Sequence, residues 1–248
     1  MKNYYELVDA NKFKSNLVIF GFVAFITVSA YFIGYALGYG LDFVGFALVF
    51  SGLASFASYY YSDRIVLSLS SAKPAKRSDH FDYYTVTENL SRVARIPMPA
   101  LYVIEDTAMN AFATGRDPKH AALVATTGIL AKLNRTELEG VIGHELSHVK
   151  NYDIRLMGVV TILIGIVTLM ADYLLRFSFY GGRRRDRDEN NQLQAVFMLA
   201  GLVLALLSPL IAQLIQLAIS RRREFLADAS SATLTKYPEG LASALEKL

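Results

Sequence analysis

The stretch His144-Glu145-Leu146-Ser147-His148 indicates the fold and the chemistry of this chain more directly than any other part of the sequence. It lies in a polar-flanked segment that is predicted to be helical, and residues four apart on a helix share one face. His144 and His148 can therefore reach one zinc ion, each through a ring nitrogen at about 2.0–2.1 Å. Glu145, one step round the helix, can act as general base for a water molecule at the open position of that metal. The alternative is a helix that carries two solvent-facing histidines and no metal.

The composition points to a membrane protein. Hydrophobic residues make up 53% of the 248 residues, and the mean hydropathy is +0.31. Two apolar runs, at about residues 16–38 and 41–61, are each long enough to cross a bilayer. A third and a fourth apolar run lie at about residues 157–177 and 193–220. Lysines precede the first run, and no Lys or Arg separates it from the second. The positive-inside trend therefore places the amino terminus and the segment from residue 62 onward in the cytoplasm.

The second pair of apolar runs, within residues 157–220, is harder to place. If this hairpin spans the bilayer, the arginine-rich stretch 181–191 faces the outside, against the positive-inside trend. The uncharged part of the third run, residues 157–171, extends only about 22 Å at about 1.5 Å per residue, less than the roughly 30 Å of a hydrocarbon core. Asp172 and Arg176 then follow at a spacing that allows a local ion pair. Whether the hairpin crosses completely stays open.

A polar segment between the two hairpins, residues 62–156, is the predicted cytoplasmic zinc domain, and residues 221–248 complete it after the second hairpin. Apolar residues at helical spacing predict a helix over residues 82–95. Residues 101–104 and 121–126 are short β-prone runs, separated by a polar loop. Asn134 and Glu137 have the spacing of a capping box, which opens the helix that leads to His144.

These elements predict an α+β fold class: a predominantly helical, multi-pass membrane protein with a small mixed α/β zinc domain. The amino-terminal hairpin occupies residues 1–61. The chain has no cysteine, which excludes disulfides and thiolate ligands. Its net charge of +3 is too small and too dispersed to suggest a nucleic-acid partner.

A third metal ligand is required, because catalytic zinc sites generally use three protein ligands and keep a fourth position for water. The chain has no cysteine, and the other two histidines, His80 and His120, lie far upstream in loop-like segments, so a carboxylate is expected. Glu224 is the best candidate because it lies just past the fourth apolar run. Asp228, four residues later on the same face, can accept a hydrogen bond from the free N–H of a ligand histidine. The alternative is a charged, solvated end of a membrane helix.

The chain resembles the HtpX and Ste24-type family of membrane zinc endopeptidases, which have a zincin-type catalytic domain of the gluzincin kind. The resemblance covers most of the chain and rests on the two amino-terminal apolar runs, on the sequence Asn110-Ala111-Phe112-Ala113-Thr114-Gly115, on the histidine helix with Asn151 and Asp153 after it, and on Glu224-x-x-x-Asp228. Members of the family usually continue past the point where Leu248 ends this sequence.

The resemblance implies one Zn²⁺ per chain, held by His144, His148 and Glu224, with Glu145 as catalytic base. It also implies that residues 121–126 form the edge strand on which substrate lies, by main-chain pairing that leaves sequence preference loose. The implied substrate-binding residues are Asn110, Ala121, Leu123, Val124, Ala125 and Thr126.

The expected function is zinc-dependent hydrolysis of misfolded or damaged membrane proteins in protein quality control and the stress response. The expected location is the bacterial cytoplasmic membrane, with the bilayer and unfolded proteins as partners and the site facing the cytoplasm. One alternative is a Ste24-type protease that processes specific, for example lipidated, peptides. Another is a membrane scaffold or transporter that carries the pentapeptide incidentally. An intramembrane protease is disfavoured, because Lys132, Arg135 and Lys150 bracket the motif.

Overall fold

A computed structural model describes residues 4–36, 41–180, 198, 199, 201 and 221–248 of the chain. The contacts divide the chain into two compact units. One unit comprises residues 1–14, 59–158 and 218–248, and the other comprises residues 15–58 and 159–217. The predicted fourth apolar run, residues 193–220, and the arginine-rich stretch 181–191 lie almost wholly outside the described residues.

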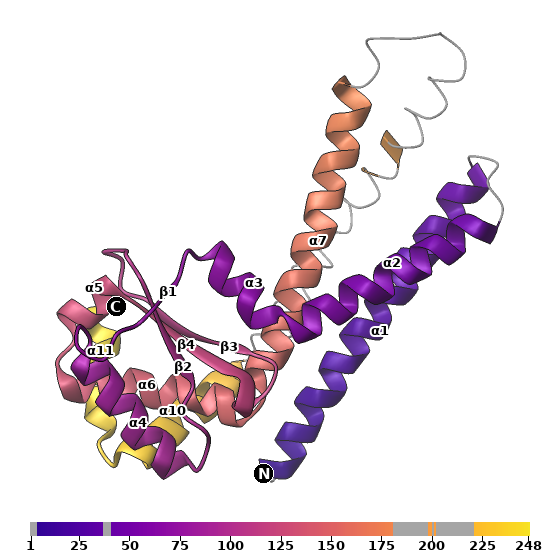
Figure 1. Ribbon diagram of the computed structural model, residues 1–248. Helices are drawn as coiled ribbons and strands as arrows, with labels where there is room; N and C mark the ends of the chain where they lie inside the picture. Colours follow the sequence, from indigo (N-terminus) through magenta and orange to yellow (C-terminus); the bar gives the residue numbers. More distant parts are fainter. Residues whose placement is uncertain (1–3, 37–40, 181–197, 200, 202–220) are drawn as a thin grey trace. The chain divides into compact units, whose positions relative to one another are not determined.

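Helices predominate among the described elements, and a small sheet accompanies them (Figure 1). The elements in chain order are α1 (Tyr4–Ala36), α2 (Leu41–Tyr60), α3 (Ser62–Leu69), β1 (Lys73–Pro74), α4 (Phe81–Ala94), β2 (Ala100–Ile104), β3 (Ala111–Gly115), η1 (Pro118–His120), β4 (Ala121–Thr126), α5 (Thr127–Lys132), α6 (Arg135–Lys150), α7 (Asp153–Tyr180), α10 (Arg221–Thr235) and α11 (Pro238–Lys247). The predicted α+β class is confirmed for the unit that holds the sheet.

The sheet has four strands in the order β1-β2-β4-β3. β4 runs parallel to β2 and antiparallel to β3, so it is hydrogen-bonded on both sides. The expectation that residues 121–126 form the edge strand is therefore wrong, and β3 is the edge strand on this side of the sheet. All six residues of β4 are buried, because a central strand covered on both faces has no solvent side.

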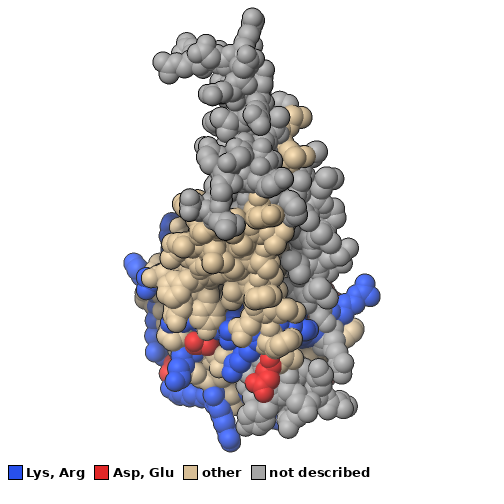
Figure 2. Space-filling model, turned by 90° about the vertical axis from the view of Figure 1, so that its right-hand side faces the viewer, with Lys and Arg blue, Asp and Glu red and all other residues tan. Residues whose placement is uncertain are grey.

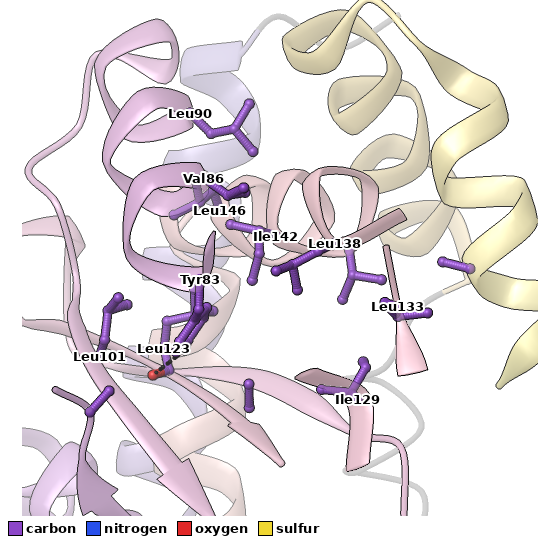
Figure 3. Close-up of a cluster of buried hydrophobic side chains, with 14 of the residues drawn as sticks. Tyr83, Val86, Leu90, Leu101, Leu123, Ile129, Leu133, Leu138, Ile142 and Leu146 are labelled. Atoms are coloured by element: carbon purple, nitrogen blue, oxygen red, sulfur yellow. Dashed lines mark hydrogen bonds between the residues drawn. The ribbon is translucent and has the colours of Figure 1, made fainter. Parts of the chain in front are cut away.

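Both faces of β4 are covered by apolar side chains from helices. Leu123 lies in the main core with residues of α4 and α6, and Val124 packs on the opposite face with Leu67 of α3. Figure 3 shows Tyr83 of α4 directed toward the sheet and Val86 of α4 beside Leu146 of α6. The dashed line marks the hydrogen bond from the hydroxyl of Tyr83 to the carbonyl oxygen of Leu123, at 2.9 Å.

α6, the helix that carries both motif histidines, begins where the sequence predicts. The side chain of Asn134 accepts a hydrogen bond from the backbone N–H of Glu137, and the carboxylate of Glu137 accepts one from the N–H of Asn134. The predicted capping box is thus confirmed. Close contacts then fix the helix in its unit: the Cα position of Gly140 lies so near α11 that an added Cβ would be 2.5 Å from the backbone nitrogen of Leu241.

Three of the predicted apolar runs are helical, in α1, α2 and α7. Among the described residues, one segment, Asp9–Val28, is long and apolar enough to cross a membrane, and the number rises to three if two bent pairs of consecutive helices each form one span. The predicted local pair is present in α7, where Nε of Arg176 lies 2.7 Å from Oδ2 of Asp172.

Candidate metal centre

The two motif histidines project from one face of α6, one helical turn apart. Their Nε2 atoms lie 3.1 Å from each other. His148 is 8% exposed, and His144 is partly buried. The four-residue spacing on a regular helix is sufficient to place the two rings together, and their ring centroids are 4.8 Å apart.

Glu224 comes to the same point from α10, a helix far along the chain. Its Oε2 atom lies 3.3 Å from Nε2 of His144 and 3.6 Å from Nε2 of His148. One potential ligand atom from each of the three residues falls within a group whose members are all within 4.8 Å of one another. The structure therefore brings the candidate third ligand from α10 to the histidine pair on α6.

A carboxylate lies behind each imidazole. Nδ1 of His144 is 2.8 Å from Oδ1 of Asp228, and Nδ1 of His148 is 3.1 Å from Oδ2 of Asp153. An ionised carboxylate only accepts hydrogen bonds, so each Nδ1 carries a hydrogen, and each Nε2 is left as the nitrogen that can offer a lone pair to a metal once it has lost its own proton. This arrangement fixes the tautomer and the ring orientation that a metal ligand needs.

The sequence reasoning proposed Asp228 for this supporting role, but it assigned no role to Asp153. The sequence offers one signal for this role: Asp153 is a carboxylate close after the histidine helix, two residues past the C-cap of α6. Its approach to His148 depends on the break between α6 and α7, where Tyr152 adopts a positive φ of 60°. Helical periodicity alone does not predict the side-chain direction across such a break.

The pKa of His148 reflects its neighbours. Burial lowers this pKa, but the hydrogen bonds to Asp153 and Glu224 outweigh burial and raise the pKa to about 10. The same contact with His148 lowers the pKa of Glu224 below its usual value, against the effect of burial. The site is thus electrostatically complementary to cationic charge even before a metal is added.

Glu145 points from α6 toward the edge strand. Its Oε2 accepts a hydrogen bond from the backbone N–H of Ala113 in β3, at 3.0 Å. Burial raises the pKa of Glu145 above its usual value, while His148 and His144 oppose this rise. A carboxylate held beside a metal site with a raised pKa is suited to accept and return a proton near neutral pH.

The predicted substrate-binding residues, Asn110 and five residues of β4, are not metal ligands, and the structure places them in the sheet and next to it. Asn110 is exposed and directly precedes β3, and its backbone pairs with Thr126 at the end of β4. The predicted residues of β4, Ala121 and Leu123 to Thr126, are buried inside the sheet. Main-chain pairing of a substrate on β4 is therefore excluded, because β2 and β3 already occupy both of its edges.

The donor set fits zinc. Two imidazole nitrogens and one carboxylate oxygen form one of the common ligand sets of catalytic zinc sites, which leave a fourth position open. A hard cation such as Mg²⁺ or Ca²⁺ prefers oxygen ligands throughout. The carboxylates behind the two imidazoles add the supporting contacts that metal-binding histidines almost always have.

The fold and the site together define a metallopeptidase of the His-Glu-x-x-His class. The profile of peptidase family M48 matches residues 82–248, and the chain belongs to this family. Among similar proteins, the protease HtpX homolog of Dictyoglomus thermophilum is 43% identical over 99% of this chain and 79% of its own length. The protease HtpX homolog of Streptococcus uberis is 42% identical over 98% of this chain and 83% of its own.

A third relative, the protease HtpX homolog of Streptococcus equi subsp. equi, is 46% identical over 82% of this chain and 69% of its own length. No solved structure matches the chain significantly. Membership of a peptidase family over most of the chain removes the alternative of a scaffold or transporter with an incidental motif.

Proposed function

We propose that this chain is a membrane-bound zinc endopeptidase that cleaves misfolded or damaged membrane proteins at the cytoplasmic face of the bacterial cytoplasmic membrane. The observation that carries the proposal is the convergence of His144, His148 and Glu224 on one point, with Glu145 beside them. The similarity to HtpX-homolog proteases over nearly the whole chain supports the same activity.

The residues of the site support peptide hydrolysis by a water nucleophile. His144, His148 and Glu224 would hold zinc, which supplies a Lewis acid that lowers the pKa of its bound water toward about 7 and polarises a carbonyl group. Glu145 takes the proton of the attacking water on its carboxylate and passes it to the leaving amine. The N–H of Ala113 keeps the Glu145 carboxylate in place.

The edge strand β3 offers the substrate a main-chain partner. The register of β3 with β4 is antiparallel and pairs Ala111 with Ala125. The N–H of Thr126 donates to the carbonyl of Asn110, and hydrogen-bonded pairs alternate along an antiparallel ladder. The even-numbered residues of β3 therefore bond to β4. The odd-numbered residues direct their N–H and C=O groups to the other side. The N–H of Ala113, which donates to Glu145, confirms this alternation.

An extended substrate could therefore bond to the outer edge of β3, directly beside the catalytic carboxylate. Main-chain recognition depends weakly on side chains, which suits a protease that acts on many damaged proteins. Replacing one amide hydrogen of a peptide substrate by methyl should lower kcat/KM by up to roughly tenfold at the paired position. An equal rate at every methylated position would count against pairing on β3.

The membrane location rests on the apolar helices. The segment Asp9–Val28 passes the length and hydropathy test for a span, and large apolar side chains such as Phe20 and Phe46 are exposed in α1 and α2. The face drawn in Figure 2 includes a described area without charged side chains. Together with the exposed apolar side chains of α1 and α2, this area supports contact with a bilayer.

The decisive experiment compares Glu145→Gln with the wild type in detergent, using casein and a misfolded membrane protein as substrates. We expect Glu145→Gln to keep stoichiometric zinc and to lose at least about 100-fold in turnover, because a general base contributes 10²–10⁴-fold. Glu139→Gln, which removes the charge of a partly exposed ion pair between Arg135 and Glu139 on the same helix, is the matched control. Undiminished cleavage by zinc-loaded Glu145→Gln protein would refute the mechanism.

The same assay separates quality control from specific processing. A quality-control protease should cleave the misfolded membrane protein and casein, and should leave the folded form of the same membrane protein intact. Cleavage restricted to a lipidated peptide would instead favour the Ste24-type role and overturn the proposed substrate class.

A further inference from the structure

The amino-terminal helix α1 supplies a buried polar residue to the unit that contains the metal centre. Residues 1–14 belong to that unit, and Asn11 is only 5% exposed there. The side-chain nitrogen of Asn11 donates to the carbonyl oxygen of Asn151 at 2.9 Å and to Oδ1 of Asp153 at 2.8 Å. Both hydrogens of this amide are thus used on the segment that follows the histidine helix.

Asp153 is the carboxylate behind His148, so the contact with Asn11 leads directly to a metal ligand. Oδ2 of Asp153 faces Nδ1 of His148, while Oδ1 accepts from Asn11. The side chain of Asp153 is 3% exposed, and a buried carboxylate is tolerated only when its oxygens are hydrogen-bonded or paired. Asn11 provides one of these bonds and fixes which oxygen is left for His148.

The contacts of Asn11 continue to the other side of the site. Nη1 of Arg223 lies 3.4 Å from Oδ1 of Asn11 and 3.6 Å from Oδ1 of Asp153. Arg223 is 8% exposed and directly precedes Glu224 in α10. One amide from α1 therefore bonds to groups that adjoin two of the three candidate ligands, His148 and Glu224.

We propose that Asn11 is a positioning residue of the metal centre, acting through Asp153 on the orientation of His148. This inference rests on the proposed zinc peptidase function. It makes α1 more than a membrane anchor: the helix that contains the candidate span Asp9–Val28 also completes the hydrogen bonds that support the metal site. The zinc affinity of the protein then depends on the hydrogen bonds that Asn11 of α1 makes to Asn151 and Asp153.

The test measures zinc binding of the full chain in detergent by competition with a chromophoric chelator. Loss of a group that contacts a metal-binding histidine weakens metal binding by roughly 10–100-fold. Asn11 does not contact His148 itself but contacts Asp153, which does. We therefore expect Asn11→Ala to raise the zinc dissociation constant by about tenfold. Asn11→Asp, which keeps the shape but removes the donors to Asp153, should have at least this effect.

Phe13→Ala is the control, because Phe13 is 68% exposed on the same helix, and it should leave zinc affinity unchanged. Circular dichroism and thermal unfolding verify that each variant is folded. The absorption spectrum of the cobalt-substituted protein gives a second readout, since a reoriented imidazole changes the ligand field, whereas a purely structural loss of stability does not.

A double-mutant cycle with Asp153→Ala decides whether Asn11 acts through that carboxylate. We expect Asn11→Ala to add little to the loss of zinc affinity once Asp153 is gone. An unchanged dissociation constant in folded Asn11→Ala and Asn11→Asp proteins overturns the inference, and so does a full additional loss in the Asp153→Ala background. A wild-type protein that binds no zinc overturns instead the proposed function on which the inference rests.

Discussion

The two carboxylates behind the imidazoles should contribute unequally to metal binding, although both make similar contacts. Asp153 faces His148 with 3% of its side chain exposed, whereas Asp228 faces His144 with 42% exposed. When Asp228 is removed, water can take its place as acceptor for the imidazole N–H. At Asp153 the hydrogen bond lies in a low-dielectric interior, where it is stronger and harder to replace.

Removal of a group that orients a metal-binding histidine weakens metal affinity by roughly 10–100-fold. Tenfold corresponds to about 1.4 kcal/mol, so the range is about 1.4–2.8 kcal/mol. From the difference in exposure, we expect Asp228→Ala to lie near the lower limit and Asp153→Ala near the upper limit. The Nδ1–Oδ1 distance of 2.8 Å at Asp228 is the shorter of the two, so distance alone would predict the opposite order.

The measurement is the zinc dissociation constant of each variant in detergent, by chelator competition at one pH and ionic strength. Asp79→Ala, which removes an exposed aspartate of the same unit, serves as the control for a general effect of charge. Equal losses for the two variants, or a larger loss for Asp228→Ala, would show that burial does not decide the strength of these contacts.

Two further predictions concern the packing and the charge of α6. Gly140→Ala places a Cβ 2.5 Å from the backbone nitrogen of Leu241. An overpacking cost of about 3 kcal/mol, less about 1 kcal/mol of gained helix propensity, predicts a destabilisation of about 2 kcal/mol in chemical denaturation. Gly165→Ala, whose added Cβ would have nothing within 4 Å, should not destabilise the protein. Glu137 has its pKa lowered to about 2, chiefly by Lys247, so its contribution to stability is complete above its ordinary pKa and is lost as the pH falls from about 4.5 toward about 2. Glu137→Gln should therefore lower the Tm at neutral pH and flatten its fall over that acidic range, and a Tm profile parallel to the wild type would contradict this.

Local features of the sequence predicted the main elements of the unit that contains the metal centre. The spacing of His144 and His148 sets their common face, because helical periodicity depends only on residues within one turn. The capping box at Asn134 predicted the start of α6 for the same reason. The strand at residues 121–126 and the helix near residues 82–95 also follow the predicted bounds within one residue or two.

The edge strand could not be predicted in this way. β3, Ala111–Gly115, lies inside the segment expected to be a polar loop. Three of its five residues are Ala or Gly, which are depleted in strands, and the strand forms through its pairing with β4. Conversely, the continuous apolar run of residues 121–126 is the pattern of a central strand buried on both faces. This pattern was available in the sequence, and it argues against an edge position.

The sequence by itself determined the chemistry of the site: which donors are present, and which two share a helix face. Those properties depend on residue type and on short-range geometry. Only the tertiary structure decided that Glu224 reaches the histidine pair, that Asp153 lies behind His148, and that Asn11 of the first helix bonds to Asp153. Such contacts join residues as far as 142 positions apart, and they form because packing of the helices leaves buried polar groups that must find partners in one another.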